Sequence, residues 1–191
     1  MNMSGQSFFE EYLFFIALTL LSISSGLLIR FLASALGIAK MQKSVFMLDE
    51  LIGQILLRKS FLQTFTRIYL WNVLISSIVI CSGIITLGVL PLVWAFLNLG
   101  LFFPDIDLFR LHLYPWIEEA ANILSAALGA WIGQNLYAFP GAFPFFAWIA
   151  ISLFGLYMVS ALLETFKIHY AWKNPLHFLF KIVSMTLPLP W

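Results

Sequence analysis

The sequence contains little charge. Asp, Glu, Lys and Arg make up 10% of its 191 residues, whereas about 25% is usual in a soluble globular protein. Hydrophobic residues make up 62%, and the mean hydropathy is +0.96. The net charge is only +1, so no basic surface for nucleic acid is expected. These proportions exclude a soluble domain of any size and predict an integral membrane protein in contact with the lipid bilayer.

Cysteine and catalytic motifs are equally scarce. The one cysteine, Cys81, lies inside an apolar run and has no second cysteine with which to form an internal disulfide. The sequence contains no Gly-x-Ser-x-Gly, His-Glu-x-x-His, Walker or Rossmann pattern, and its three histidines fall near predicted membrane edges. We therefore expect no catalytic residue, no metal site and no cofactor.

Long apolar runs predict an all-α, polytopic membrane protein in which residues 1–191 form a single transmembrane domain. A spanning helix needs about 20 residues, so about four to five membrane elements fit this length. One of them is expected to be short or broken, because Gly88 and Pro91 interrupt the second run and proline usually kinks or ends a helix. The predicted elements are spanning helices at 12–39, 68–87, 114–136 and 145–166, a short or half helix at 91–103, and an interfacial segment at 175–190.

The distribution of basic residues predicts the orientation. Residues 40–67 hold half of all Lys and Arg, so the positive-inside rule places this loop in the cytoplasm and the N-terminus outside. Within the loop, VFMLDELIGQILL has the spacing of an amphipathic helix that lies along the membrane face. Lys167 and Lys173 are also cytoplasmic if residues 91–103 cross the membrane, and outside if that segment re-enters. We favour the crossing.

Three predicted helices each carry a stripe of polar and small residues. A helix turns by about 100° per residue, which places Glu118, Asn122 and Ser125 on the same face as two glycines. We expect Gly83, Gly129 and Gly133 to pack helices closely, because small residues let backbones approach in a membrane. The polar members, together with a charge in the first helix, predict a buried polar seam: Arg30, Asn72, Ser76, Glu118, Asn122 and Ser125.

Charges within the apolar runs need an explanation. A charge at the bilayer centre costs at least about 2.5 kcal/mol, so Arg30 and Glu118 each require a partner, water or an interfacial position. We predict that they pair with each other; the alternative for Arg30 is to extend its side chain to the headgroups. The loop that follows the short element carries either a solvated turn or a site that handles ions or docks a partner, and its candidate residues are Asp105, Asp107, Arg110 and His112.

The segment EEAANILSAALGAWIGQ resembles the signature helix of the stage II sporulation protein M family. In that family a glutamate is followed by an alanine and then by glycines eleven and fifteen residues after the glutamate, a spacing met by Glu118, Ala121, Gly129 and Gly133. The resemblance extends over about residues 40–165. The family usually has Pro-His-Gly before the glutamate, and this sequence has Leu113, Tyr114 and Pro115 there.

This resemblance implies a non-enzymatic scaffold or subunit of a multiprotein complex in the cytoplasmic membrane of a prokaryote. Its partners would be other membrane proteins, in a homo- or hetero-oligomer. The alternative is a component of a transporter for ions, lipids or small solutes, motivated by the split second run and the buried charges. A minor alternative is an intramembrane protease, because a Glu-Glu pair precedes later histidines; however, the arginine expected shortly after that pair is absent, and His169 and Asn174 are five residues apart.

Overall fold

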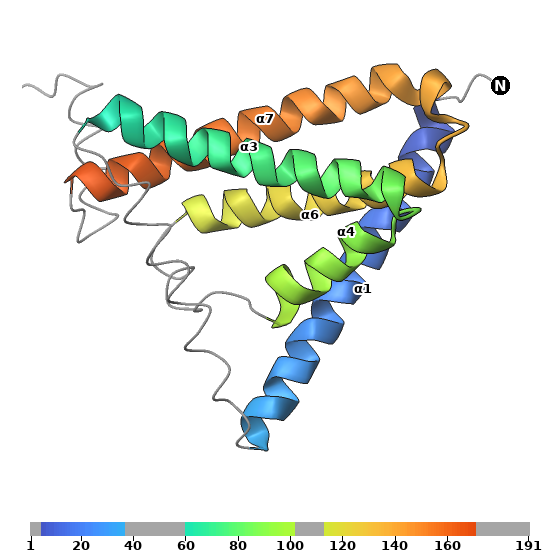
Figure 1. Cartoon of the computed structure of the whole chain (residues 1–191), viewed down its shortest axis with the longest axis horizontal. Helices are drawn as coiled ribbons and strands as arrows, with labels where there is room; N and C mark the ends of the chain where they lie inside the picture. Colours follow the sequence, from blue (N-terminus) through green and yellow to red (C-terminus); the bar gives the residue numbers. More distant parts are fainter. Residues whose placement is uncertain (1–4, 37–59, 102–112, 171–191) are drawn as a thin grey trace, which may run out of the picture.

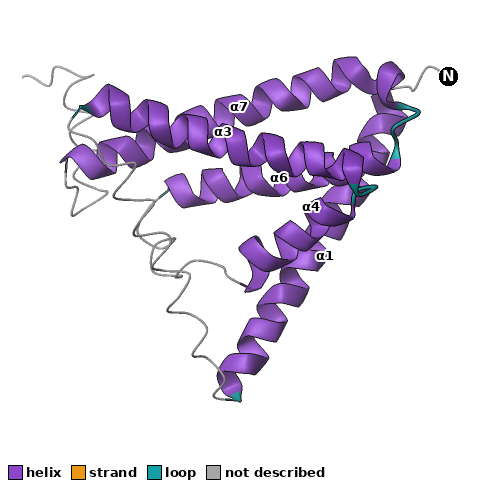
Figure 2. Ribbon diagram, in the orientation of Figure 1, coloured by secondary structure: helices purple, strands orange, loops and turns teal. Residues whose placement is uncertain are grey.

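The computed structural model describes residues 5–36, 60–101 and 113–170, and within these ranges all regular structure is helical (Figure 2). Three helices contain stretches long and apolar enough to cross a membrane, namely Ser7–Ala35, Phe61–Ile85 and Pro140–Ile168. The described part of the chain is therefore all-helical, and these helices indicate a membrane protein that contacts lipid. The elements are α1 (Gly5–Ala35), α3 (Phe61–Ile85), α4 (Val89–Trp94), the π-helix η2 (Ala95–Leu101), α6 (Tyr114–Gln134) and α7 (Phe139–Tyr170).

Several boundaries differ from the predicted ones. Helix α3 begins at Phe61, inside the predicted loop 40–67, because Ser60 caps it: the Ser60 backbone is extended, and its hydroxyl accepts a hydrogen bond of 3.2 Å from the Gln63 backbone N–H. The predicted short element is divided into α4 and η2. The amphipathic segment after residue 43, the segment 175–190 and the loop residues Asp105, Asp107, Arg110 and His112 lie outside the described residues.

Helix α6 is the central helix. Every residue from 125 to 133 is buried, and α6 contacts α1, α3, α4 and α7. Alanine, glycine and serine dominate this stretch, and such small residues allow neighbouring helices to come close on several sides. The first turns of α6, before this buried stretch, carry Glu118 and Glu119, which are half-buried.

Helices α3, α6 and α7 run side by side, and α1 crosses one end of this group and then diverges from it (Figure 1). The starts of α3 and α6 lie beside the end of α7: the rings of Phe61 and Phe166 are 4.9 Å apart, and Lys167 Nζ donates to Tyr114 Oη at 3.3 Å. At the opposite end, α3 turns into α4 through Leu87 and Gly88, which have positive φ angles of 51° and 81°. The α4–η2 segment then runs along α1, back toward the end at which α3 and α6 begin.

The two halves of α1 have different surroundings. Its N-terminal half packs on α6 and α7, where the Phe8 ring lies 4.8 Å from Trp131 and 5.4 Å from Phe145. Its C-terminal half contacts η2 so closely that a Cβ at Gly26 would lie 2.8 Å from the Leu101 nitrogen. Beyond that contact the large apolar side chains are exposed, with Phe31 at 69%. One half of α1 therefore belongs to the core, and the other forms an apolar projection.

Candidate functional site

A chain of polar contacts joins α3, α6 and α7. Ser76 Oγ and Ser125 Oγ lie 2.7 Å apart, and Ser125 Oγ lies 3.2 Å from Tyr157 Oη. Tyr157 donates to Asn122 Oδ1 at 2.8 Å, and Asn122 Nδ2 donates to Glu119 Oε2 at 3.4 Å. Ser76, Ser125 and Tyr157 are buried. We call these five residues the polar network; it connects three helices through side chains alone.

Two of the polar stripes expected from the sequence meet in this network. Residues 119, 122 and 125 share one face of α6, since residues three apart are neighbours on a helix. Ser76, on the stripe of α3, faces Ser125. Sequence reasoning missed Tyr157, although a signal existed: a tyrosine hydroxyl in an apolar helix needs a hydrogen-bond partner when it is buried. The predicted seam also lacked Glu119, whose side chain accepts from Asn122 in the structure.

The glycines expected to pack helices lie in one contact. A Cβ at Gly83 would overlap the carbonyl of Gly129, and a Cβ at Gly133 would overlap the Gly83 carbonyl and the Gly88 backbone. Helices α3 and α6 therefore touch through their backbones, with the start of α4 against the same surface. No side chain fits between them at this level.

A group of charged residues lies where α6 begins and α7 ends. Glu118 lies beside the Ser160 hydroxyl, close enough to Glu119 and Glu164 for their charges to interact. Glu164 in turn interacts with Lys167, whose ammonium lies 5.3 Å from the centre of the Tyr114 ring. We call Glu118, Glu119 and Glu164 the carboxyl cluster. Glu119 belongs to both groups.

The structure does not bring Arg30 to Glu118. The charged groups that act on Glu118 are Glu164 and Glu119, and Arg30 lies in the diverging half of α1, whose end is well apart from the start of α6 (Figure 1). The pair was predicted because each charge needs a partner, without knowledge of the path of α1. Asn72, also expected in the seam, has a buried Nδ2 without a hydrogen-bond partner among the described residues.

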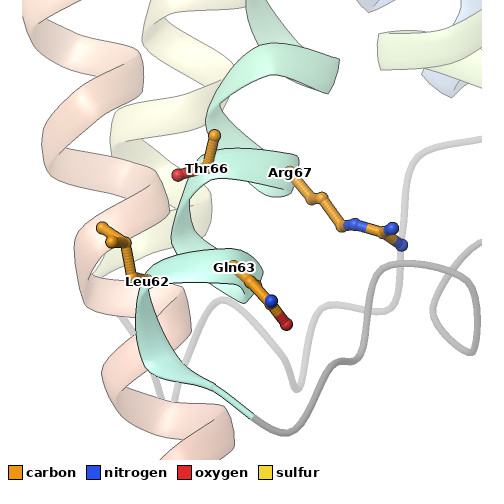
Figure 3. A pocket seen from close by; sticks show the side chains of 4 residues that line it. All are labelled: Leu62, Gln63, Thr66 and Arg67. Atoms are coloured by element: carbon orange, nitrogen blue, oxygen red, sulfur yellow. The ribbon is translucent and has the colours of Figure 1, made fainter.

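The described residues show no other arrangement with an obvious chemistry. Within 5–36, 60–101 and 113–170, no three His, Cys, Asp or Glu side chains are grouped so as to hold a metal ion. A surface hollow lies at the start of α3, where Gln63 and Arg67 point away from α7 (Figure 3). Leu62 and Thr66 complete its lining. This hollow is on the outer surface and does not reach the polar network.

Comparison with known proteins adds nothing to this geometry. No protein-family model matches the chain, and neither a curated protein nor a solved structure matches it. The candidate site is therefore defined by the structure alone, as the polar network, the adjoining carboxyl cluster and the glycine contact beside them.

Proposed function

We propose that this chain is a non-enzymatic scaffold or subunit of a multiprotein complex in the cytoplasmic membrane of a prokaryote. The observation that carries this proposal is the closed packing of α3 on α6. Gly83 meets the Gly129 backbone directly, which leaves no width for a solute at that level. The polar side chains nearby bond to one another across the helices. Such a bundle is suited to present fixed surfaces to other proteins.

The diverging half of α1 supports the same proposal. Its apolar side chains are exposed, with Leu28 at 58%, and in the described chain this half packs mainly on η2. A helix that stands apart from its own bundle offers a face against which a partner helix can pack. The resemblance of α6 to the stage II sporulation protein M signature adds support for a scaffold in a prokaryotic membrane.

The ends of the helices support the proposed orientation. The start of α3, which follows the basic segment 40–59, lies at the same end of the bundle as Lys167. Both basic regions then lie on one side of the membrane, as the positive-inside rule requires of a cytoplasmic side. In this orientation the α4–η2 segment returns toward the cytoplasm, and the N-terminus of α1 lies outside.

Cross-linking in native membranes tests the proposal. The full chain, carrying an affinity tag, is cross-linked before solubilisation and purified in mild detergent. We expect a small set of membrane proteins to co-purify in fixed ratio, and the double substitution Leu28→Ala and Phe31→Ala to remove them. Leu70→Ala with Leu74→Ala, which alters exposed residues of α3, is the matched control. A tagged chain that stays alone in cross-linked native membranes would contradict the proposal.

A transporter component for ions, lipids or small solutes is the second candidate. The carboxyl cluster favours it, because ionisable side chains inside a membrane domain often mark a path for ions or protons. Single cysteines at Ser76, Asn122 and Glu118, in a Cys81→Ser background, distinguish the two candidates. Labelling of all three by a water-soluble thiol reagent would favour transport. Protection of Ser76→Cys and Asn122→Cys would favour the subunit.

A further inference from the structure

While Glu119 is ionised, the hydrogens of the polar network cannot be placed so that every contact holds one. Each hydroxyl group carries a single hydrogen, and an ionised carboxylate carries none. Besides the contacts described above, Ser125 Oγ also lies 2.8 Å from the backbone oxygen of Ala121, as a donor to it. The network therefore contains five short contacts: Ser76–Ser125, Ser125–Ala121, Ser125–Tyr157, Tyr157–Asn122 and Asn122–Glu119.

When Glu119 is ionised, its carboxylate determines which group donates in each hydrogen bond of the network. The carboxylate only accepts, so Asn122 must donate Nδ2–H to it and receive the Tyr157 hydrogen on Oδ1. Ser125 then has one hydrogen for two acceptors, the Tyr157 oxygen and the Ala121 carbonyl. One of the five contacts stays without a hydrogen, and a buried contact left unmade in this way is destabilising.

A proton on Glu119 removes this deficit. Glu119 then donates to the Asn122 oxygen, after a half turn of the amide that exchanges the positions of its oxygen and nitrogen. Asn122 donates to Tyr157, Tyr157 donates to Ser125, and Ser125 donates to the Ala121 carbonyl. The second lone pair of Ser125 accepts from Ser76. All five contacts now hold one hydrogen each, and the exchange within the Asn122 amide is the only change in heavy-atom positions.

We propose that Glu119 is a proton-binding group, and that its proton reverses the hydrogen bonds that run from α6 through Tyr157 of α7 to Ser125. When the proton is bound, the Tyr157 hydroxyl turns from Asn122 toward Ser125, and the contacts among α3, α6 and α7 are all made. When the proton leaves, one of these contacts is lost. The protonation state of one carboxyl thus determines how firmly three helices are joined, whether the chain serves a complex or a transport path.

The neighbours of Glu119 favour the neutral form. On α6 itself, Glu118 lies close enough for its charge to repel a second carboxylate, and Glu164 of α7 acts on Glu118 from beyond. Tyr157 is the facing titratable group of α7 within the network, and α3 contributes the uncharged Ser76. Lys167, near the end of α7, acts on Glu164. Among the described residues no cation is found to act on Glu119, and an unpaired buried charge is costly.

Infrared spectroscopy of the full-length protein in lipid discs tests the proposal. The carbonyl stretching band of a protonated carboxyl, assigned with ¹³C-labelled glutamate, should be present at neutral pH and lost in Glu119→Gln. Glu10→Gln, which makes the same change at an exposed position of α1 outside both groups, should retain the Glu119 band. Tyr157→Phe removes the hydroxyl that connects Asn122 to Ser125 and should shift the frequency of that band.

The pH dependence of unfolding gives a second readout. If the folded chain holds a proton that the unfolded chain releases at neutral pH, stability falls as pH rises, by at most about tenfold in the folding equilibrium constant per pH unit for one proton. In Glu119→Gln, the slope of stability against pH should decrease by the amount that corresponds to one proton. Glu10→Gln, at an exposed position, should leave the slope unchanged. A wild-type band that survives in Glu119→Gln, or one that Tyr157→Phe does not shift, would overturn the proposal, as would an ionised Glu119 at neutral pH.

Discussion

A methyl group added at Gly83 would overlap the carbonyl oxygen of Gly129, so the backbones of α3 and α6 are in direct contact at this point. The neighbouring surface is made in the same way, by Gly133 against the Gly83 carbonyl and the Gly88 backbone. Backbone contact of this kind gives dispersion attraction over many atoms and tolerates no side chain between the helices.

The substitution Gly83→Ala should destabilise the protein by about 3 kcal/mol, at the upper end of the usual cost of overpacking, because the obstructing atoms belong to backbone that cannot rotate away. Unfolding in mixed detergent micelles measures this free energy. Gly155→Ala on α7 is the matched control, since its Cβ would meet nothing within 4 Å. We expect this variant to be neutral or more stable by up to about 1 kcal/mol, as alanine favours helix. Equal losses in both variants would contradict the contact.

The Ser76–Ser125 contact should appear as a coupling energy in a double-mutant cycle. Ser125→Ala is expected to cost more than Ser76→Ala, because Ser125 also contacts Tyr157 and the Ala121 carbonyl. The coupling should be about 0.6 to 1.7 kcal/mol, the range from the average to the largest values for hydrogen bonds between membrane helices.

Ser77 provides the control for this cycle. Its hydroxyl donates to the carbonyl of Val73 within the same helix, at 2.7 Å. A cycle between Ser77→Ala and Ser125→Ala should therefore give no coupling. A coupling of similar size for Ser77 would show that the effect spreads through α3 and does not come from the bond between the two hydroxyls.

The stripes of α3 and α6 could be predicted from the sequence because their information is local. Helical periodicity places Asn122, Ser125, Gly129 and Gly133 near one face, and polar or small residues in apolar helices tend to face protein. The meeting of Ser76 with Ser125 then requires only that the two stripes face each other.

The path of α1 and the choice of Tyr157 could not be predicted in the same way. Helix α7 is apolar on all sides, so its periodicity does not show which face carries a contact. The divergence of α1 depends on where Gly26 meets Gly100 of η2, and hence on the π-helical turn of η2, which no sequence pattern indicated. The Arg30–Glu118 pair failed for this reason, because both charges needed partners but the helices that carry them separate.

The indole of Trp131 makes a further test possible. Trp131 is fully buried, and its Nε1–H donates to Glu11 Oε2 at 3.1 Å, which joins α6 to the start of α1. Glu11→Leu leaves this donor without an acceptor and should cost about 1–3 kcal/mol, as expected for an unsatisfied buried group. Glu11→Gln keeps a carbonyl oxygen at the same place and should cost less than about 1 kcal/mol. Detergent unfolding compares the two, and equal losses would mean that the carboxylate charge, not the hydrogen bond, matters.

The turn from α3 to α4 predicts opposite effects at adjacent residues. Gly88 has φ 81°, and a Cβ there would lie 3.1 Å from the Ala130 Cα. A left-handed conformation alone costs other residues about 1–2 kcal/mol. Gly88→Ala should therefore destabilise the protein by about 2 kcal/mol or more. Leu87 has φ 51° with a side chain 62% exposed. Leu87→Gly should relieve that strain, which outweighs the entropy of glycine of about 0.5–1 kcal/mol, and so stabilise the protein slightly. The Gln134 amide donates to the Leu87 backbone oxygen, so this hydrogen bond remains in both variants, and unfolding measurements isolate the backbone effect. A loss of stability in Leu87→Gly as large as that in Gly88→Ala would contradict this account of the turn.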